Sequence, residues 1–175
     1  SLKDSFRKAD FILGSAVNEF EEKFSKYCSI NYSVGCANGT DALYLALKTL
    51  NLPKGSEVIV PAMTWISTVL SIINCGLKPV LVDVDMRNSL ISIEEIKKKI
   101  NTKTKVILPV HMLGMTADME GIMNLAAKHD LKVLEDCCEA TGAKYQGKYV
   151  GNVADAGAFS FDFGKVITTG EGGMV

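Results

Sequence analysis

Long apolar runs are missing from this sequence of 175 residues, and none approaches the ~18 to 20 residues that a membrane-spanning helix needs. An excess of one charge is missing as well, because 19 lysines and arginines stand against 20 aspartates and glutamates. The formal net charge of -1 supplies no basic field for nucleic acid or an anionic membrane surface. We therefore expect neither nucleic-acid nor membrane partners.

Paired cysteine motifs are also absent. The five cysteines include no C-x-x-C pair, and neither of the two histidines stands at a zinc-finger spacing from them. This pattern predicts the buried thiols of a cytoplasmic protein, with no disulfide framework and no metal site. The adjacent Cys137 and Cys138 should point in opposite directions on extended chain, which disfavours their binding one ion together.

Three common site motifs are missing too. The segment 38–40 has neither G-x-x-x-x-G-K-[ST] nor G-x-G-x-x-G, so a nucleotide-binding loop is poorly supported there. No G-x-S-x-G elbow accompanies Ser160 and His111, which argues against a Ser-His-Asp triad. His111 follows an apolar run, and we interpret it as a hydrogen-bonded structural histidine.

The sequence does contain an alternation of short β-branched runs with amphipathic helical stretches. Runs such as VIV and PVLVDV are apolar on both faces, which is typical of a parallel sheet covered by helices. The pattern predicts a three-layer α/β/α domain with a mostly parallel sheet. We expect strands at 32–36, 57–60, 79–84, 106–110, 132–135 and 158–161, helices at 17–27, 39–50, 65–75, 93–100 and 119–129, and a hairpin turn at 146–148.

The two ends differ from this pattern. Residues 1–13 show little periodicity and are assigned to an N-terminal segment, while residues 14–175 form one large domain. The last residues, 172–175, look like the beginning of a strand that has no partner to pack against. We therefore expect the domain to be truncated here and the natural chain to be longer.

Several residues with chemical potential follow directly after predicted strands. They include Gly39, Trp65, Asp136, Ser160 and Lys165. In open α/β sheets, ligands bind outside the carboxyl ends of the strands. These side chains should therefore gather at one edge of the sheet, and this is the strongest argument for a site.

The turn at Gly39 and Thr40 suits an anion, because free N–H groups and the helix dipole both attract negative charge. Gly39 would let the backbone approach a phosphate, and the hydroxyls of Thr40 and Ser160 could donate to it. A simple N-cap, with Thr40 or Asp41 satisfying the first turn, is the commoner explanation of this sequence taken alone.

A flat heteroaromatic ligand would suit three further residues. Asp136 ends a strand and could pair with a pyridinium nitrogen, or it could merely cap a turn. Glu139 could reach the same ring, although alone it resembles a solvated surface residue. Trp65, the only tryptophan, could stack on an aromatic cofactor, although a core tryptophan is the commoner case.

Lys165 stands between an apolar strand and the segment 168–173, which contains two threonines and three glycines. A lysine forms imines readily when desolvation or nearby cations lower its pKa and leave a neutral amine. The glycines would let the backbone pass close to a bulky ligand. The plain alternative is a surface lysine in a mobile loop.

Six segments in order together resemble the DegT-type sugar aminotransferase family. Members of that family are pyridoxal 5'-phosphate (PLP) enzymes of the aspartate-aminotransferase fold, fold type I. The matching segments are GSAVNEFEEKF (14–24), ANGTDALYLAL (37–47), EVIVPAMTWIST (57–68), VHMLGMTADM (110–119), LEDCCEATG (134–142) and FSFDFGKVITTGEGG (159–173).

The resemblance implies a role for each candidate. Lys165 resembles the lysine that holds PLP as a Schiff base and moves the proton between the two stages of the reaction. The other implied roles are the pyridinium partner (Asp136), the aromatic over the ring (Trp65), the phosphate ligands (Gly39, Thr40 and Ser160) and a polar residue beside the ring (Glu139). Many members carry histidine where this chain has Asp162, so no substrate role is carried over to that position.

The family typically moves an amino group from glutamate to a nucleotide-linked keto-deoxysugar for lipopolysaccharide, other surface polysaccharides or antibiotic sugars. A branch that dehydrates the sugar has histidine in place of the lysine, so Lys165 favours transamination. The resemblance also implies a homodimer with shared active sites and a smaller C-terminal domain that lies outside this sequence. The alternatives are a PLP-binding regulatory or non-catalytic module, a PLP-dependent sugar dehydratase and a nucleotide-binding domain without PLP.

Overall fold

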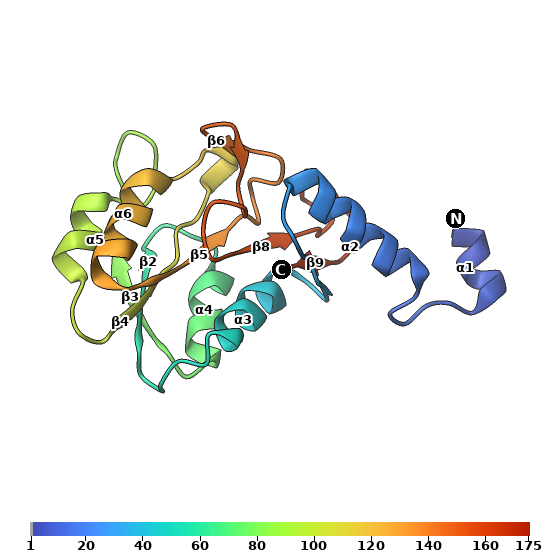
Figure 1. Ribbon diagram of the computed structural model, residues 1–175, viewed down its shortest axis with the longest axis horizontal. Helices are drawn as coiled ribbons and strands as arrows, with labels where there is room; N and C mark the ends of the chain where they lie inside the picture. Colours follow the sequence, from blue (N-terminus) through green and yellow to red (C-terminus); the bar gives the residue numbers. More distant parts are fainter. Residues whose placement is uncertain (1) are drawn as a thin grey trace.

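A seven-stranded sheet runs through the molecule, whose computed structural model describes residues 2–175 (Figure 1). The strand order is β1-β9-β8-β5-β4-β2-β3. Neighbouring strands are parallel except around β9, which runs antiparallel to both β1 and β8. The strands are Gly35–Cys36 (β1), Glu57–Pro61 (β2), Lys78–Val82 (β3), Thr104–Ile107 (β4), Lys132–Asp136 (β5), Ala156–Ser160 (β8) and Gly173–Met174 (β9). The expected mostly parallel sheet is confirmed.

Helices cover both faces of this sheet, which confirms the three-layer architecture. In Figure 1, α3 and α4 lie on one side of the sheet, and α2, α5 and α6 lie on the other. The helices are Ser15–Cys28 (α2), Gly39–Thr49 (α3), Ile66–Asn74 (α4), Ile93–Lys99 (α5) and Met119–His129 (α6). None of the helices within residues 2–175 combines the length and the apolar character that a membrane crossing requires.

Three small elements complete the fold. The hairpin of β6 (Lys144–Tyr145) and β7 (Lys148–Tyr149) turns through Gln146 and Gly147, whose φ angles of 48° and 83° suit a tight hairpin turn. This confirms the expected turn. The helix α1 (Leu2–Lys8) and a short 3-10 helix η1 (Met112–Gly114) were not expected from the sequence. In Figure 1, α1 lies away from the sheet and its covering helices.

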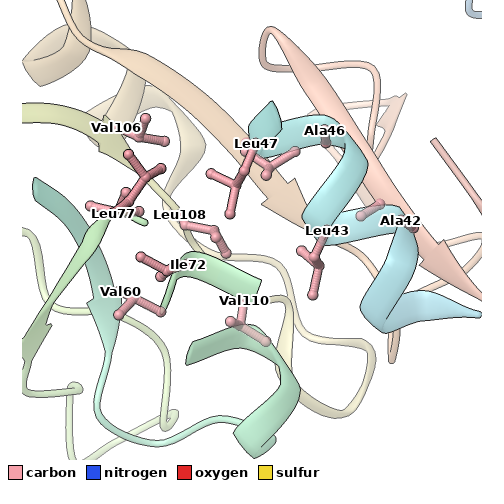
Figure 2. Close-up of a cluster of buried hydrophobic side chains, with 13 residues drawn as sticks. Ala42, Leu43, Ala46, Leu47, Val60, Ile72, Leu77, Val106, Leu108 and Val110 are labelled. Atoms are coloured by element: carbon pink, nitrogen blue, oxygen red, sulfur yellow. The ribbon is translucent and has the colours of Figure 1, made fainter. Parts of the chain in front are cut away.

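The first core layer lies between the sheet and the pair α3 and α4 (Figure 2). Leu43 and Leu47, four residues apart on one face of α3, are both buried there. They lie in one cluster with apolar side chains of four parallel strands or their ends (β2, β4, β5 and β8), among them Val60, Val106 and Leu108. Burying each such side chain contributes about 1.5–3 kcal/mol, so this layer holds α3 and α4 against the sheet.

The opposite face carries an aromatic cluster beneath α2. Phe24 on α2 packs with Phe159 and Phe161, which stand at and just beyond the end of β8. Along β8, Ala158 faces the α3 layer and Phe159 faces α2, as the alternation of side chains in a strand requires. Cys137 belongs to the aromatic cluster, whereas Cys138 stands in the turn after β5 and lines a cavity on another side, so the two side chains are separated although the chain here is not extended.

The structure corrects three expectations at the margins of the sheet. The run 79–84 is not covered on both faces, because β3 is an edge strand and Leu81 is 52% exposed. The expected strand at 32–36 shortens to two residues, with Tyr32 exposed. The expectation that the final strand lacks a partner was wrong, because β9 pairs with both β1 and β8 and Met174 is fully buried.

Phe24→Ala tests the contribution of the aromatic cluster. The Phe24 ring centroid lies 4.9 Å from that of Phe159 and 5.4 Å from that of Phe161. Because the truncation leaves a cavity, we expect the free energy of unfolding to fall by roughly 3–5 kcal/mol, measured by urea denaturation. The matched Phe163→Ala, at an exposed position, should change it by about 0.5 kcal/mol or less. Equal losses in the two variants would contradict the assigned core.

Candidate active site

A cavity of about 490 Å³ opens at the carboxyl ends of the parallel strands. This volume lies within the range of about 300–1,000 Å³ found for small-molecule sites. The structure brings together all seven residues that sequence reasoning placed in a site. Those lining the cavity are Gly39, Thr40, Trp65, Asp136, Glu139, Ser160 and Lys165. Asp162, the position that departs from the family pattern, also lines it.

One end of the cavity is the start of α3. Asn38 caps this helix, because its Oδ1 accepts the Asp41 N–H at 2.8 Å and its carbonyl accepts the Ala42 N–H at 3.0 Å. The expected capping by Thr40 or Asp41 is therefore wrong. The leading N–H groups of a helix have no intrahelical partner, and here Gly39 and Thr40 carry them beside the cavity. This end of the cavity suits an anion.

Gly39 is required by close packing at this end. A Cβ atom on Gly39 would lie 2.8 Å from Ser160 Cβ and 2.9 Å from Cys138 Sγ, closer than real contacts allow. The absence of a side chain lets the start of α3 approach the end of β8. The hydroxyl of Ser160 and the backbone of Gly39 therefore border the same small space.

Asp136 lies at the floor of the cavity and is only 3% exposed. Its Oδ1 accepts the Cys138 N–H at 3.1 Å, and its Oδ2 accepts the Thr68 hydroxyl at 2.9 Å. Burial raises the pKa of Asp136, while these hydrogen bonds and the nearby His111 act to lower it. Asp136 is thus a buried carboxylate that is poised to accept a cationic partner from the cavity.

Trp65 and Glu139 border the opening. Trp65 precedes the first turn of α4 and is 72% exposed, so the alternative of a core tryptophan is wrong. An exposed indole at a cavity rim has a free face on which a ring can stack. Glu139 Oε2 accepts the Leu113 N–H at 3.1 Å, which ties this carboxylate to the neighbouring loop instead of leaving it in solvent.

Lys165 lies on the loop that joins β8 to β9. The loop closes by hydrogen bonds from Phe161 N to Gly172 O at 2.8 Å and from Thr169 N to Phe161 O at 3.0 Å. Lys165 N also donates to Asp162 O at 3.0 Å, which forms a turn at the cavity. Within residues 2–175, no hydrogen bond or ion pair engages the Lys165 amine. The backbone is held while the amine is left available to a ligand.

His111 lies behind the site. It is fully buried, its Nδ1 accepts the Ala117 N–H at 3.1 Å, and its Nε2 lies 3.0 Å from Glu135 Oε2. The Nε2 therefore carries the hydrogen and donates it to the carboxylate. Glu135, His111 and Cys137 have their ligand atoms within 4.8 Å of one another, but these hydrogen bonds already engage the histidine and carboxylate. His111 has the structural role expected from the sequence.

Sequence reasoning missed several residues that line the cavity, among them Thr68, Met112, Cys138 and Glu171. For Thr68 a signal was available. It stands four residues after Thr64 at the start of a helix, so both hydroxyls fall on one face, directed to the sheet edge. The other three had no such signal, because their positions depend on how the loops after β4, β5 and β8 fold back.

Gly39→Ala tests the close approach of α3 and β8. The added methyl group meets Ser160 and Cys138, and forcing an extra carbon into a packed site costs about 1–3 kcal/mol. We expect the affinity of the full-length protein for PLP to fall about tenfold or more, as measured by titration. Gly164→Ala is the matched control, because this glycine lines the same cavity with no atom within 4 Å of the added carbon. A similar loss of PLP affinity in both variants would contradict the close packing of Gly39 against Ser160 and Cys138.

Known proteins are similar to this chain in both sequence and fold. The chain is 44% identical over 163 residues to the GDP-perosamine synthase of Caulobacter vibrioides. The matched region covers 93% of this chain and 44% of that relative. The aminotransferase from Psychrobacter cryohalolentis superposes with a TM-score of 0.95 at 40% identity, covering 98% of this chain and 44% of that one. An E. coli GDP-4-keto-6-deoxy-D-mannose-3-dehydratase with bound hydrated PLP superposes with a TM-score of 0.93 at 32% identity. The superposition covers 98% of this chain and 46% of that one.

The chain thus spans less than half the length of these relatives. Over that stretch it has the same α/β fold, with the mostly parallel sheet and the cavity at its carboxyl edge. The sequence profile that describes the DegT/DnrJ/EryC1/StrS aminotransferases matches residues 1–175. The chain belongs to the DegT/DnrJ/EryC1/StrS aminotransferase family.

Proposed function

We propose that this chain is the cofactor-binding part of a PLP-dependent aminotransferase. The enzyme moves an amino group from an amino acid, glutamate, to a nucleotide-linked keto-deoxysugar used in polysaccharide, lipopolysaccharide or antibiotic-sugar biosynthesis. One observation carries the proposal: an unengaged lysine amine and a buried carboxylate line the same cavity in a chain whose relatives are sugar aminotransferases. The name of the Caulobacter relative supports a nucleotide-linked sugar as the substrate class.

The residues present fit PLP at both ends of the molecule. The phosphate suits the start of α3, where Gly39 has no room for a side chain and where Thr40 and Ser160 line the cavity. The ring nitrogen suits Asp136, whose burial leaves it in need of a positive partner. When bound, PLP supplies an electron sink for the carbon that loses or gains a proton.

The chain's own residues would then have distinct tasks. Asp136 keeps a proton on the ring nitrogen, and Trp65 covers one ring face and excludes water. Glu139 orients the ring's polar substituent while its Oε2 stays bonded to Leu113 N. Lys165 attaches the cofactor and afterwards carries the proton between the donor and acceptor stages, since its amine is not held by another side chain.

The reaction at the nucleotide-linked sugar separates the proposed aminotransferase from its nearest alternative, a dehydratase. A dehydratase with this fold is 32% identical to the chain, so dehydration of the sugar is a real competitor. Lys165 supports transamination, because a lysine returns the proton to the carbon that receives the new amine. Asp162 lines the cavity without an assigned role.

We also propose that the enzyme is a homodimer. The outer side of α4 exposes Ile66, Leu70 and Ile73, spaced so that they form one stripe, and Trp65 continues that stripe to the cavity. An exposed apolar stripe of this kind suits a covering protein surface. A second copy packed there would shield the cavity mouth, which supports active sites shared between subunits.

Two further assignments belong to the same proposal. Residues 14–175 form the PLP-binding large domain behind an N-terminal segment of residues 1–13, and a smaller C-terminal domain completes the enzyme. The enzyme acts in the cytoplasm, which is supported by five cysteines that are all free thiols.

Lys165→Ala tests the attachment residue. The full-length wild-type protein should be yellow and should carry a cofactor linkage that borohydride reduces, because the lysine amine holds the cofactor covalently. The variant should lose the reducible linkage, as followed by absorption and mass spectrometry. Lys148→Ala, which changes an exposed lysine on β7, is the control and should retain it. A colourless wild-type protein that takes up no PLP would overturn the proposal.

A half-reaction with glutamate tests turnover. The full-length enzyme should convert its bound cofactor to the amino form and release 2-oxoglutarate, whereas a regulatory or non-catalytic module would bind PLP without this change. A screen of nucleotide keto-deoxysugars then identifies the acceptor by mass spectrometry. An aminated sugar that contains the glutamate nitrogen supports transamination, and a deoxygenated sugar without nitrogen would establish dehydration instead.

A further inference from the structure

Two threonines at the start of α4, Thr64 just before the helix and Thr68 on its first turn, connect to Asp136. Thr64 Oγ1 lies 2.8 Å from Thr68 Oγ1, and Thr68 Oγ1 donates to Asp136 Oδ2 at 2.9 Å. We propose that Thr68, supported by Thr64, is a positioning residue that keeps Asp136 ionised and aimed at the ring nitrogen of the cofactor. The inference rests on the proposed PLP function and assigns α4 a part in it.

The direction of the hydrogens in this chain follows from the carboxylate. An ionised Asp136 can only accept, so the single hydrogen of the Thr68 hydroxyl points to it. The oxygen of Thr68 is then left as an acceptor, and the hydrogen between the threonines belongs to Thr64. All donors therefore point toward Asp136, and successive hydrogen bonds of this kind polarise and strengthen one another.

The position of Thr68 makes its hydroxyl hard to replace. It is only 1% exposed, so its hydroxyl is in contact with protein atoms and its bond to Asp136 is buried. The other carboxylate oxygen is held by the Cys138 N–H at 3.1 Å. Each oxygen keeps a further lone pair, which leaves room for a donor that enters from the cavity. The two bonds orient the carboxylate without saturating it.

The electrostatics of Asp136 show why such support matters. Burial is the largest influence and raises the pKa of Asp136, which favours the neutral acid. The hydrogen bonds from Cys138 and Thr68 oppose it, because they are made to the charged form. A neutral Asp136 would not hold a proton on the ring nitrogen. Because α4 carries no titratable side chain, the Thr68 hydroxyl is what α4 contributes to keeping Asp136 ionised.

The charged and titratable groups around Asp136 come from three other segments. His111 follows β4. Glu135 lies on β5, and Cys138 and Glu139 follow that strand. Asp162, Lys165 and Glu171 follow β8. None of them is removed by a change at Thr68. The same turn of α4 also positions Trp65, whose carbonyl accepts the Thr68 N–H at 3.0 Å. One turn thus places both the stacking residue and the donor to Asp136.

Thr68→Val in the full-length holoenzyme tests the inference, because valine keeps the shape and removes the hydroxyl. Without this donor Asp136 becomes more basic and draws the proton away from the ring nitrogen. The nitrogen that joins Lys165 to the cofactor then becomes more basic. We expect the pH midpoint of the bound cofactor's visible absorption band to rise by roughly half a unit or more. The affinity for PLP should fall roughly tenfold. Thr68→Ser, which restores the donor, should return both values toward wild type.

Two controls separate positioning from stability. Thr104 is also 1% exposed, and its hydroxyl accepts the Asn101 N–H at 3.0 Å at the far end of β4. Thr104→Val should lower stability and leave the pH midpoint unchanged. Thr64→Val should shift the midpoint in the same direction as Thr68→Val by a smaller amount, and it carries the test alone if the Thr68 variant does not fold.

The outcomes distinguish this inference from the function on which it rests. A folded Thr68→Val enzyme with the wild-type midpoint overturns it, as does an unshifted Thr64→Val enzyme when the Thr68 variant is unfolded. Equal shifts in Thr68→Val and Thr104→Val also overturn it, because the effect would then be one of stability. A wild-type protein that binds no PLP refutes the proposed function instead, and it does so before any threonine variant is measured.

Discussion

A carboxylate buried at the end of a central strand is the constraint around which the cavity is arranged. Removing an ionised group from water costs several kcal/mol unless hydrogen bonds and a positive partner compensate. Asp136 receives two hydrogen bonds, from Thr68 and from the Cys138 N–H, and it faces a cavity that contains Lys165. Its main chain is held as well, because Asp136 N donates to Pro109 O and Asp136 O accepts the His111 N–H. The remaining requirement for positive charge supports our proposal that Asp136 receives a cationic group of a ligand.

The reversal of chain direction at β9 determines where Lys165 lies. Because β9 runs antiparallel to β8, the loop between them returns across the carboxyl edge of the sheet and carries Lys165 into the cavity. The start of α3 comes within contact of the end of β8 only because Gly39 has no side chain. The lysine, the anion end and the carboxylate therefore converge from segments that are far apart in sequence.

The sequence predicted the covered part of the fold well and its margins poorly. Strands in the middle of the sheet, such as β2, are buried on both faces, and their unbroken apolar runs signal this directly. Edge strands carry no such signal. The run 79–84 has the composition of a central strand, yet β3 lies at the edge with Leu81 exposed. The strand β9 has only two residues, and its burial depends on neighbours at both sides.

For the site, the sequence by itself determined which residues stand at the ends of strands, and topology then required them to share one edge of the sheet. That was sufficient for Asp136, Ser160 and Lys165. Only the tertiary structure decided which side chains serve the fold and which face the cavity. It places Trp65 at the rim of the cavity and the hydroxyl of Thr68 against Asp136. The physical reason is that the bond from Thr68 to Asp136 joins residues 68 apart in sequence, so the spacing of Thr64 and Thr68 indicates a shared face but not the partner that this face meets.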